Sequence, residues 1–231
     1  MASGVINMTN MQTVTASTPP QQQVLTAPTV ALRGVSWQTF KALLADIGDG
    51  RAYRIAYDQE VLEIRMPLTE HEVPKRLLED FITSIADELN IEAMSLGALL
   101  LEQEDLTRAI EPDSCFYIKN EALVRSKTID LQTDPPPDLA IESDYTSSSL
   151  NKFTIYASIG VPELWRYFRQ TLEVYQLVEG KYELSDKSRA FPFLPLAEVP
   201  GFIEQSKTIG QRAVVRLFRE RIREILQSGE R

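Results

Sequence analysis

Residues 135–165 read PPPDLAIESDYTSSSLNKFTIYASIGVPELW, and this stretch decides the fold that the sequence predicts. The apolar run inside 138–142 predicts a short buried strand that ends in a carboxylate. The hydroxyl-rich run that follows supplies helix N-caps, so a helix is expected over 148–159. A second strand is expected over 163–167. This order of strand, helix and strand is typical of a sheet with helices packed on its faces.

The polar residues of this stretch predict a chemical site. Glu142 closes the first strand, while Lys152 and Tyr156 lie four residues apart on one face of the helix. Lys152, in the first helical turn, can reach back toward Glu142, and a carboxylate with a lysine suits metal-assisted phosphodiester cleavage. Each residue also has a structural interpretation. Glu142 can be a solvated strand end, Lys152 a surface lysine, and Tyr156 a core aromatic whose hydroxyl has a partner.

Asp113 is the second candidate carboxylate. It follows Pro112 and precedes the strand-like run SCFYI, so it is expected near the start of a strand. Two carboxylates on adjacent strands can share one hard cation, because Mg²⁺ is bound by one or two carboxylates together with phosphate and water. Asp138 also follows a proline, but the strand rise places it about 13 Å from Glu142, too far for one ion. Asp113 and Glu142 are therefore the predicted ligands of Mg²⁺ or Mn²⁺, although a Pro-Asp pair alone is equally typical of a turn.

The rest of the chain predicts one domain behind a polar tail. Residues 1–30 are rich in Thr, Ser, Gln and Pro and carry almost no charge, which predicts a disordered N-terminal tail. Residues 31–231 are expected to form a single domain, since 231 residues that are 43% hydrophobic suffice for one core. The expected class is α/β or α+β, with a central mixed sheet flanked by helices. Apolar periodicity predicts these further elements: a helix over 37–47 capped by Ser36, a hairpin of 51–57 and 61–65, a long helix from Thr69, short strands at 91–95, 98–102 and 114–118 with a turn or short helix over 102–110, a hairpin of 171–177 and 181–184, a Pro-rich loop over 192–200, and an amphipathic helix over 207–227.

Charge and residue counts exclude several classes of protein. The net charge of −9 argues against a general nucleic-acid binder, so contact with DNA would need a local basic face. Cys115 is the only cysteine and His71 the only histidine, so intrachain disulfides and Cys/His zinc sites are excluded by count. No run is long enough to span a membrane, and the N-terminus lacks the basic start of a signal peptide. The expected location is the cytoplasm, without a membrane partner.

Several motifs together resemble a known family over roughly residues 35–178. They are LEI at 62–64, EPD-x-CFYI at 111–118, PPDL-x-x-E at 136–142, TSSSLNKF-x-IYA at 146–157 and GVPELWRY at 160–167. With them the chain resembles the Uma-two family of restriction-endonuclease-like proteins, within the PD-(D/E)XK nuclease superfamily. The resemblance implies a restriction-endonuclease-like core, dependence on a divalent metal and cleavage of DNA. It also implies that Asp113 and Glu142 are the motif carboxylates, and that the protein forms a homodimer or a larger homo-oligomer.

The chain departs from the superfamily pattern in two places. The motif lysine normally stands two residues after the glutamate, where this chain has Asp144, so its role would pass to Lys152. The run at 97–101, GALLL, replaces a polar run that usually precedes the aspartate. Glu72, near the start of the long helix, would either contact the metal site through water or compensate the helix dipole. The basic C-terminal helix would either track a phosphate backbone or present a solvated face.

Two functions from different classes follow from these observations. The leading hypothesis is a Mg²⁺-dependent DNA endonuclease with Asp113, Glu142 and Lys152 as catalytic residues and Glu72 and Tyr156 in support. The alternative is a catalytically weak or inactive nuclease-fold protein that acts as a binding or regulatory module. The net charge and the missing motif lysine favour this alternative. A nuclease that acts on something other than duplex DNA is a third hypothesis.

Overall fold

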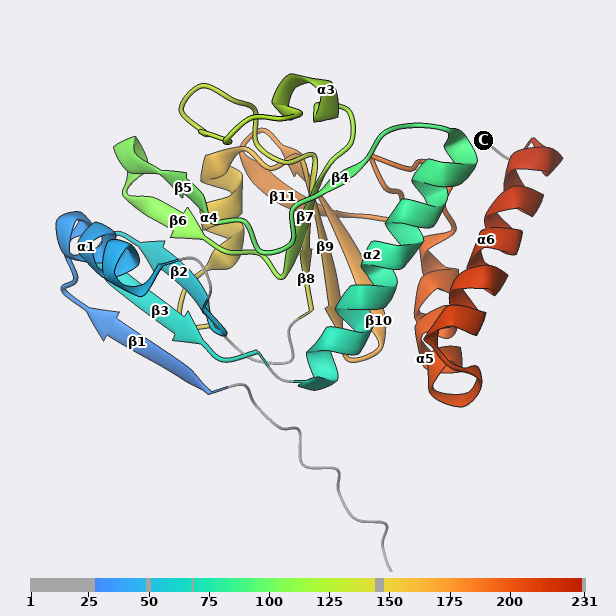
Figure 1. The fold of residues 1–231 in the computed structure, drawn as a ribbon, viewed down its shortest axis with the longest axis horizontal. Coiled ribbons are helices and arrows are strands. Elements are labelled where there is room, and N and C mark those ends of the chain that lie inside the picture. The colour runs from blue at the N-terminus through green and yellow to red at the C-terminus, as the bar shows by residue number, and fades with distance from the viewer. Residues whose placement is uncertain (1–27, 49–50, 68, 144–147, 230–231) are drawn as a thin grey trace, which may run out of the picture.

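The computed structural model describes residues 28–48, 51–67, 69–143 and 148–229, which form two β-sheets and six α-helices (Figure 1). Sheet A is antiparallel, with the strand order β1-β3-β2-β6-β5. Sheet B has the order β11-β10-β9-β8-β7-β4 and is mixed, since β8 and β9 run parallel and its other pairs are antiparallel. The strands are β1 Thr29–Arg33, β2 Arg54–Asp58, β3 Val61–Arg65, β4 Met94–Ser95, β5 Leu101–Gln103, β6 Arg108–Ile110, β7 Ser114–Tyr117, β8 Leu139–Glu142, β9 Glu163–Phe168, β10 Thr171–Val178 and β11 Lys181–Ser185.

Helices pack against both sheets and between them, which confirms the expected mixed α/β class. The helix α1 packs on sheet A, and α2, α5 and α6 pack together beside sheet B (Figure 1). The helix α4 lies between the sheets, because its apolar residues share one core with side chains from β2, β5, β6, β8 and β9. The helices are α1 Trp37–Ile47, α2 Thr69–Leu89, α3 Glu121–Val124, α4 Lys152–Ile159, α5 Val199–Ile209 and α6 Gln211–Ser228.

Local sequence signals account for the N-terminal elements. The predicted helix over 37–47 is confirmed, and the Ser36 hydroxyl accepts a hydrogen bond from the Thr39 N–H, as an N-cap should. The predicted hairpin is also confirmed, with β2 beginning at Arg54. Its two-residue turn places Gln59 and Glu60 at φ 42° and 72°, the left-handed region that glycine normally occupies.

Two expectations about elements were wrong and one was only partly right. The segment over 102–110 holds a 3₁₀ turn and the strand β6, because Ala109 and Ile110 complete the core beneath sheet A and α4. The single C-terminal helix over 207–227 is two helices, α5 and α6, because Gly210 takes φ 87° between them. The helix α5 begins inside the predicted Pro-rich loop, with Pro200 in its first turn, where proline is tolerated.

The N-terminal boundary also differs from the prediction. Residues 29–33 form β1 and pair with β3, so the last residues of the predicted tail belong to sheet A. Residues 1–27 lie outside the described part of the chain, and the predicted tail is not tested there. Within the described part, no helix combines the length and the apolar character that crossing a membrane requires.

Candidate active site

Strand alternation in β8 directs Glu142 toward α4. Leu139 and Ile141 point into the core that sheet B shares with α2, α5 and α6. Ala140 points the other way and packs in the core around α4. Since side chains alternate between the two faces of a strand, Glu142 projects on the α4 side with Ala140. A carboxylate at the end of an otherwise apolar strand therefore lies between the two sheets.

Glu142 is buried and is bound by both polar residues of α4. Its side chain is 5% exposed. Lys152 Nζ donates to Glu142 Oε2 at 2.8 Å, and the Tyr156 hydroxyl donates to Glu142 Oε1 at 2.5 Å. Lys152 and Tyr156 are one helical turn apart, so a single helix delivers both donors. The structure thus brings together the three polar residues that the opening stretch of sequence predicted to meet.

The helix α4 begins later than the sequence predicts, and a buried carboxylate explains why. Its N-cap is Asn151, not Ser148 or Ser149. Glu63 on β3 accepts hydrogen bonds from the hydroxyl of Ser148, at 2.8 Å, and from the backbone N–H of Ser149, at 2.6 Å. Both serines are therefore occupied in tying the segment before α4 to sheet A, which positions Lys152 opposite Glu142.

Asp113 lies beside Glu142 at the neighbouring strand end. It directly precedes β7, and the pairing of Ser114 with Ile141 places Asp113 next to Glu142 in the register. Its Oδ2 accepts from the backbone N–H of Ser143 at 2.8 Å, and its own N–H donates to Ile141 at 3.1 Å. The two predicted ligands therefore occupy adjacent, buried positions where β7 and β8 meet.

Arg65 joins the two carboxylates, and the sequence analysis missed it. It lies on β3, where Leu62 and Ile64 face the core under α1 while Glu63 and Arg65 face the opposite side. Its Nη2 donates to Asp113 Oδ1 at 2.8 Å and lies 3.7 Å from Glu142 Oε2. The alternation of the VLEIR run could have revealed that Arg65 points inward, but only the packing of sheet A against sheet B shows its partners.

The surroundings shift the pKa values of the two carboxyl groups in opposite directions. Burial raises the pKa of Asp113, but Arg65, Lys152 and the Ser143 N–H lower it by more, so it lies below its ordinary value. Burial raises the pKa of Glu142, and the neighbouring Asp113 charge adds to this despite Lys152. Burial and the Glu142 charge also raise the pKa of Tyr156 well above its usual range. Glu142 is thus the carboxyl of the pair that more readily binds a proton.

The remaining candidates have other partners. Glu72 forms an ion pair with Lys75 at 2.6 Å, one helical turn away, and no described contact joins it to Asp113 or Glu142. Asp138 accepts hydrogen bonds from the backbone N–H groups of Ile118 and Asn120, at 2.7 and 2.9 Å, which agrees with its expected scaffold role. Asp144 lies outside the described residues.

The donor chemistry at the strand ends fits a hard divalent cation. Two adjacent carboxylates, Asp113 and Glu142, are the protein contribution that Mg²⁺ typically receives, with phosphate and water supplying the remaining oxygens. Among the described residues, no group of three or more Asp, Glu, His or Cys is placed to hold a metal. Substrate and solvent would therefore have to complete the coordination.

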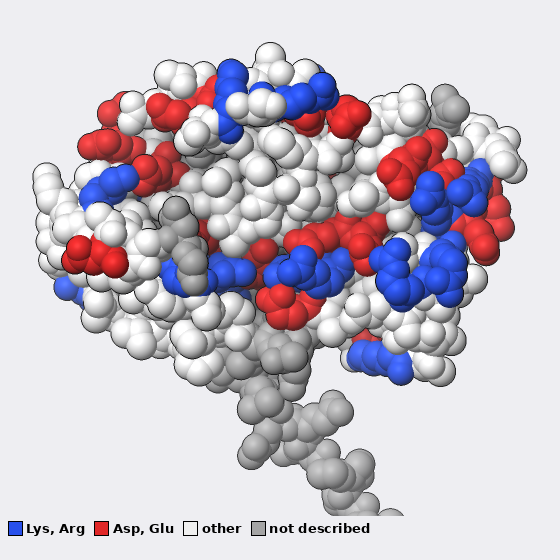
Figure 2. All heavy atoms as spheres, viewed as in Figure 1, with Lys and Arg blue, Asp and Glu red and all other residues white. Residues whose placement is uncertain are grey.

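Four arginines of the C-terminal helix α6 are paired with acidic residues of neighbouring helices. Arg212 contacts Asp80 of α2 at 3.1 Å, and Arg219 and Arg223 both contact Glu88 of α2. Arg221 binds Glu198, just before α5, through two hydrogen bonds of 2.9 Å. Figure 2 shows basic and acidic groups intermingled over α2 and α6 on this face. Because these arginines contact acidic residues of the protein itself, the helix α6 fits a role in packing better than a role in binding a phosphate backbone.

Comparison with known proteins gives a family model and a solved structure that match the chain. The model of a family called Uma2, with the description "Putative restriction endonuclease", matches residues 37–205. A crystal structure from Anabaena variabilis ATCC 29413, described as a "putative nuclease belonging to DUF820", is 14% identical. The alignment covers 78% of this chain and 99% of that chain, with a TM-score of 0.48. No curated protein matches the chain significantly.

Proposed function

Since the chain belongs to the Uma2 family of restriction-endonuclease-like proteins, we propose that it is a divalent-metal-dependent DNA endonuclease that hydrolyses phosphodiester bonds. One observation carries the proposal beyond the family: Asp113, Glu142, Lys152 and Tyr156 form one buried cluster at adjacent strand ends. Perturbed carboxyl groups beside a buried lysine are typical of catalytic sites.

In this proposal Asp113 and Glu142 hold the cation, which is Mg²⁺ or Mn²⁺. When bound, such a cation activates water and neutralises charge on a phosphate. The Tyr156 hydroxyl donates a hydrogen bond to one carboxylate oxygen of Glu142 and so orients this carboxylate. The backbone N–H of Ser143 orients Asp113 in the same way. Both carboxylates are therefore held in place before any ligand binds, which reduces the reorganisation that binding requires.

Lys152 supplies the positive charge that faces the reacting phosphate. Its side chain is 12% exposed, and its ammonium group binds Glu142. A positive charge in a site with little water stabilises the negative charge that develops on a phosphate during hydrolysis. This assigns to Lys152 the role of the lysine that the superfamily motif would place at residue 144.

The alternative function is that of a binding or regulatory protein on the same fold. Arg65 favours it, because a guanidinium already neutralises Asp113 and lies near Glu142. The net charge of −9 also disfavours approach to duplex DNA. In either case a homodimer or larger homo-oligomer and a cytoplasmic location remain proposals that rest on family expectation and on the sequence.

A plasmid assay tests the proposed function. We expect purified protein to nick or linearise supercoiled plasmid with Mg²⁺ or Mn²⁺, and EDTA to abolish this activity. The Lys152→Met variant should be slower by about 100-fold, because charge stabilisation of this kind is worth about that factor. Lys207→Met, which removes an exposed lysine on α5, is the matched control and should cleave normally. Equal cleavage by Lys152→Met would reveal a contaminating nuclease, and DNA retardation without cleavage would favour the binding function.

The affinity for Mn²⁺ should keep rising with pH above the range in which an ordinary glutamate ionises. The raised pKa of Glu142 means that a proton occupies this carboxyl at a higher pH than usual, and the proton competes with the cation. Isothermal titration calorimetry at a series of pH values measures the effect. The Glu142→Gln variant has no ionisable group at this position and should show a flatter dependence. An affinity in the native protein that does not change with pH would contradict the prediction.

A further inference from the structure

Arg65 lies where a cation shared by the two carboxylates would be expected. Its side chain is 4% exposed and comes from sheet A, whereas Asp113 and Glu142 stand at the strand ends of sheet B. The guanidinium donates to Asp113 at 2.8 Å and approaches Glu142 to 3.7 Å. It therefore bridges the same pair of side chains that the proposed function assigns to the metal.

The charges in the cluster already balance. Asp113 and Glu142 contribute two negative charges, and Arg65 and Lys152 contribute two positive charges at hydrogen-bonding distance from them. A divalent cation added to this group would face two fixed positive charges in a poorly solvated place, where such repulsion is strong. Because the Arg65 guanidinium contacts Asp113 and lies near Glu142, it is the group that a cation shared by both carboxylates must replace.

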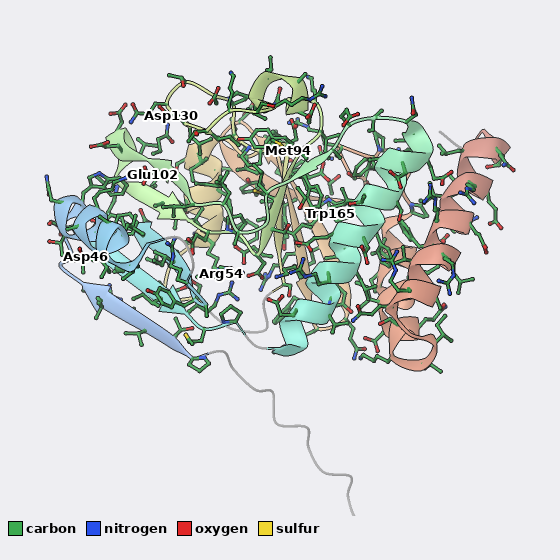
Figure 3. The ribbon with its side chains drawn as sticks, viewed as in Figure 1. Asp46, Arg54, Met94, Glu102, Asp130 and Trp165 are labelled. Carbon is green, nitrogen blue, oxygen red and sulfur yellow. The ribbon has the colours of Figure 1, made fainter. Side chains whose placement is uncertain are left out.

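The cavity next to the guanidinium has room for about one water molecule, so the guanidinium can move only if neighbouring side chains also shift. This cavity is lined by residues of sheet A, by Glu111 directly after β6 and by Lys152 of α4; the charged ones are Arg54, Glu63, Arg65, Glu111 and Lys152. Glu63 and Glu111 place negative charge along this cavity, so a displaced guanidinium would remain among carboxylates. Figure 3 shows Arg54 at the end of sheet A that is nearer to sheet B, the region in which this cavity lies.

We propose that Arg65 is an internal competitor for the divalent cation, which holds Asp113 and Glu142 together until the guanidinium moves from between them. The proposal rests on the proposed function for the identity of the two ligands, and adds a control of cation entry at the same site. The arginine keeps two buried carboxylates compatible with folding in the absence of metal. The same contact weakens the affinity of the site for Mg²⁺ or Mn²⁺.

Calorimetric titration of Mn²⁺ into full-length protein without DNA tests the proposal. Arg65→Met removes the competing charge, and we expect Mn²⁺ to bind at least about tenfold more tightly than to the native protein. The matched control is Arg54→Met, because Arg54 pairs with Arg65 across β2 and β3 and lines the same cavity. No described contact joins Arg54 to Asp113 or Glu142, so its replacement should change the affinity by less than about threefold.

Two outcomes would overturn the proposal: an Arg65→Met affinity no tighter than that of the native protein, or an equal gain in Arg54→Met. Arg65→Met leaves two carboxylates without their shared partner, so its melting temperature should be low in EDTA and rise with Mn²⁺ by more than that of the native protein. If the Arg65→Met variant folds neither in EDTA nor with Mn²⁺, a measurement on the native protein tests the proposal instead. The side-chain Nε–H NMR signal of Arg65 should shift when Mg²⁺ saturates the site, and an unmoved signal during Asp113-dependent binding contradicts the competition.

These readouts separate the proposal from the proposed function. Calorimetry, melting and the arginine signal report cation binding alone, whereas plasmid cleavage reports the reaction. Tighter Mn²⁺ binding by Arg65→Met with no cleavage by any variant would support the competition and refute the nuclease. If the native protein cleaves plasmid but its affinity for Mn²⁺ does not depend on Arg65, the nuclease is supported and the competition is refuted.

Discussion

Replacing Glu142 with glutamine is expected to lower metal-dependent plasmid cleavage by at least about 100-fold. The amide has nearly the same shape, so the Tyr156 hydroxyl can still donate to the side-chain oxygen. The variant loses the negative charge that would hold a cation, and its amide N–H groups oppose the Lys152 ammonium, which is also a donor. Single-turnover cleavage of a labelled plasmid at saturating Mn²⁺ measures the loss.

A glutamate outside the site provides the control. Glu121 on α3 is also largely buried. Its carboxylate forms an ion pair with Arg125, whose Nε donates to it at 2.8 Å. Glu121→Gln removes a comparable charge pair without touching Asp113 or Glu142, so it should cleave at the native rate. Circular dichroism establishes that both variants are folded. Native activity in a folded Glu142→Gln variant would mean that the reaction, if present, uses another site.

Replacing Glu163 with alanine is expected to lower the free energy of unfolding by about 3–5 kcal/mol. This carboxylate is fully buried at the start of β9 and organises the segment that follows β11. It accepts hydrogen bonds from Trp165 Nε1 at 2.5 Å, the Ser188 hydroxyl at 2.7 Å, and the N–H groups of Arg189 and Ala190 at 2.5 and 2.9 Å. Alanine would leave these donors without an acceptor in a place where water has little access.

Urea denaturation followed by tryptophan fluorescence measures this loss, and Trp165 reports directly on the site. The control is Glu183→Ala, which removes an exposed glutamate from β11 and should change stability by no more than about 0.5 kcal/mol. A loss below about 1 kcal/mol in Glu163→Ala would mean that these donors find other acceptors.

Elements with complete local signals were predictable, and elements that depend on distant partners were not. The helix over 37–47 combines an N-cap serine, an apolar period and a final glycine, and its bounds agree with the prediction. The strand β6 has only three residues and forms because β2 and β5 flank it, which no local pattern encodes. The start of α4 was misplaced because Glu63, about 85 residues earlier in the chain, engages the serines that would otherwise cap it.

The candidate site divides in the same way. Glu142, Lys152 and Tyr156 come from one strand–helix unit, so the spacing along the chain was enough to predict that they meet. Asp113 followed from the motif and from the pairing of adjacent strands. Glu72 was expected either to contact the metal site through water or to compensate the helix dipole, and in the structure it forms an ion pair with Lys75.

The sequence by itself determined the family, the mixed α/β class and the local contact between Glu142 and α4. The family followed from several motifs taken together, whereas the class and the local contact depend on periodicity, caps and spacings within about 15 residues. Only the tertiary structure decided that Arg65 stands between Asp113 and Glu142, because that contact joins β3 of sheet A to the strand ends of sheet B. The alternation of side chains along β3 predicts that Glu63 and Arg65 share a face. Which residues contact that face depends on how the two sheets pack.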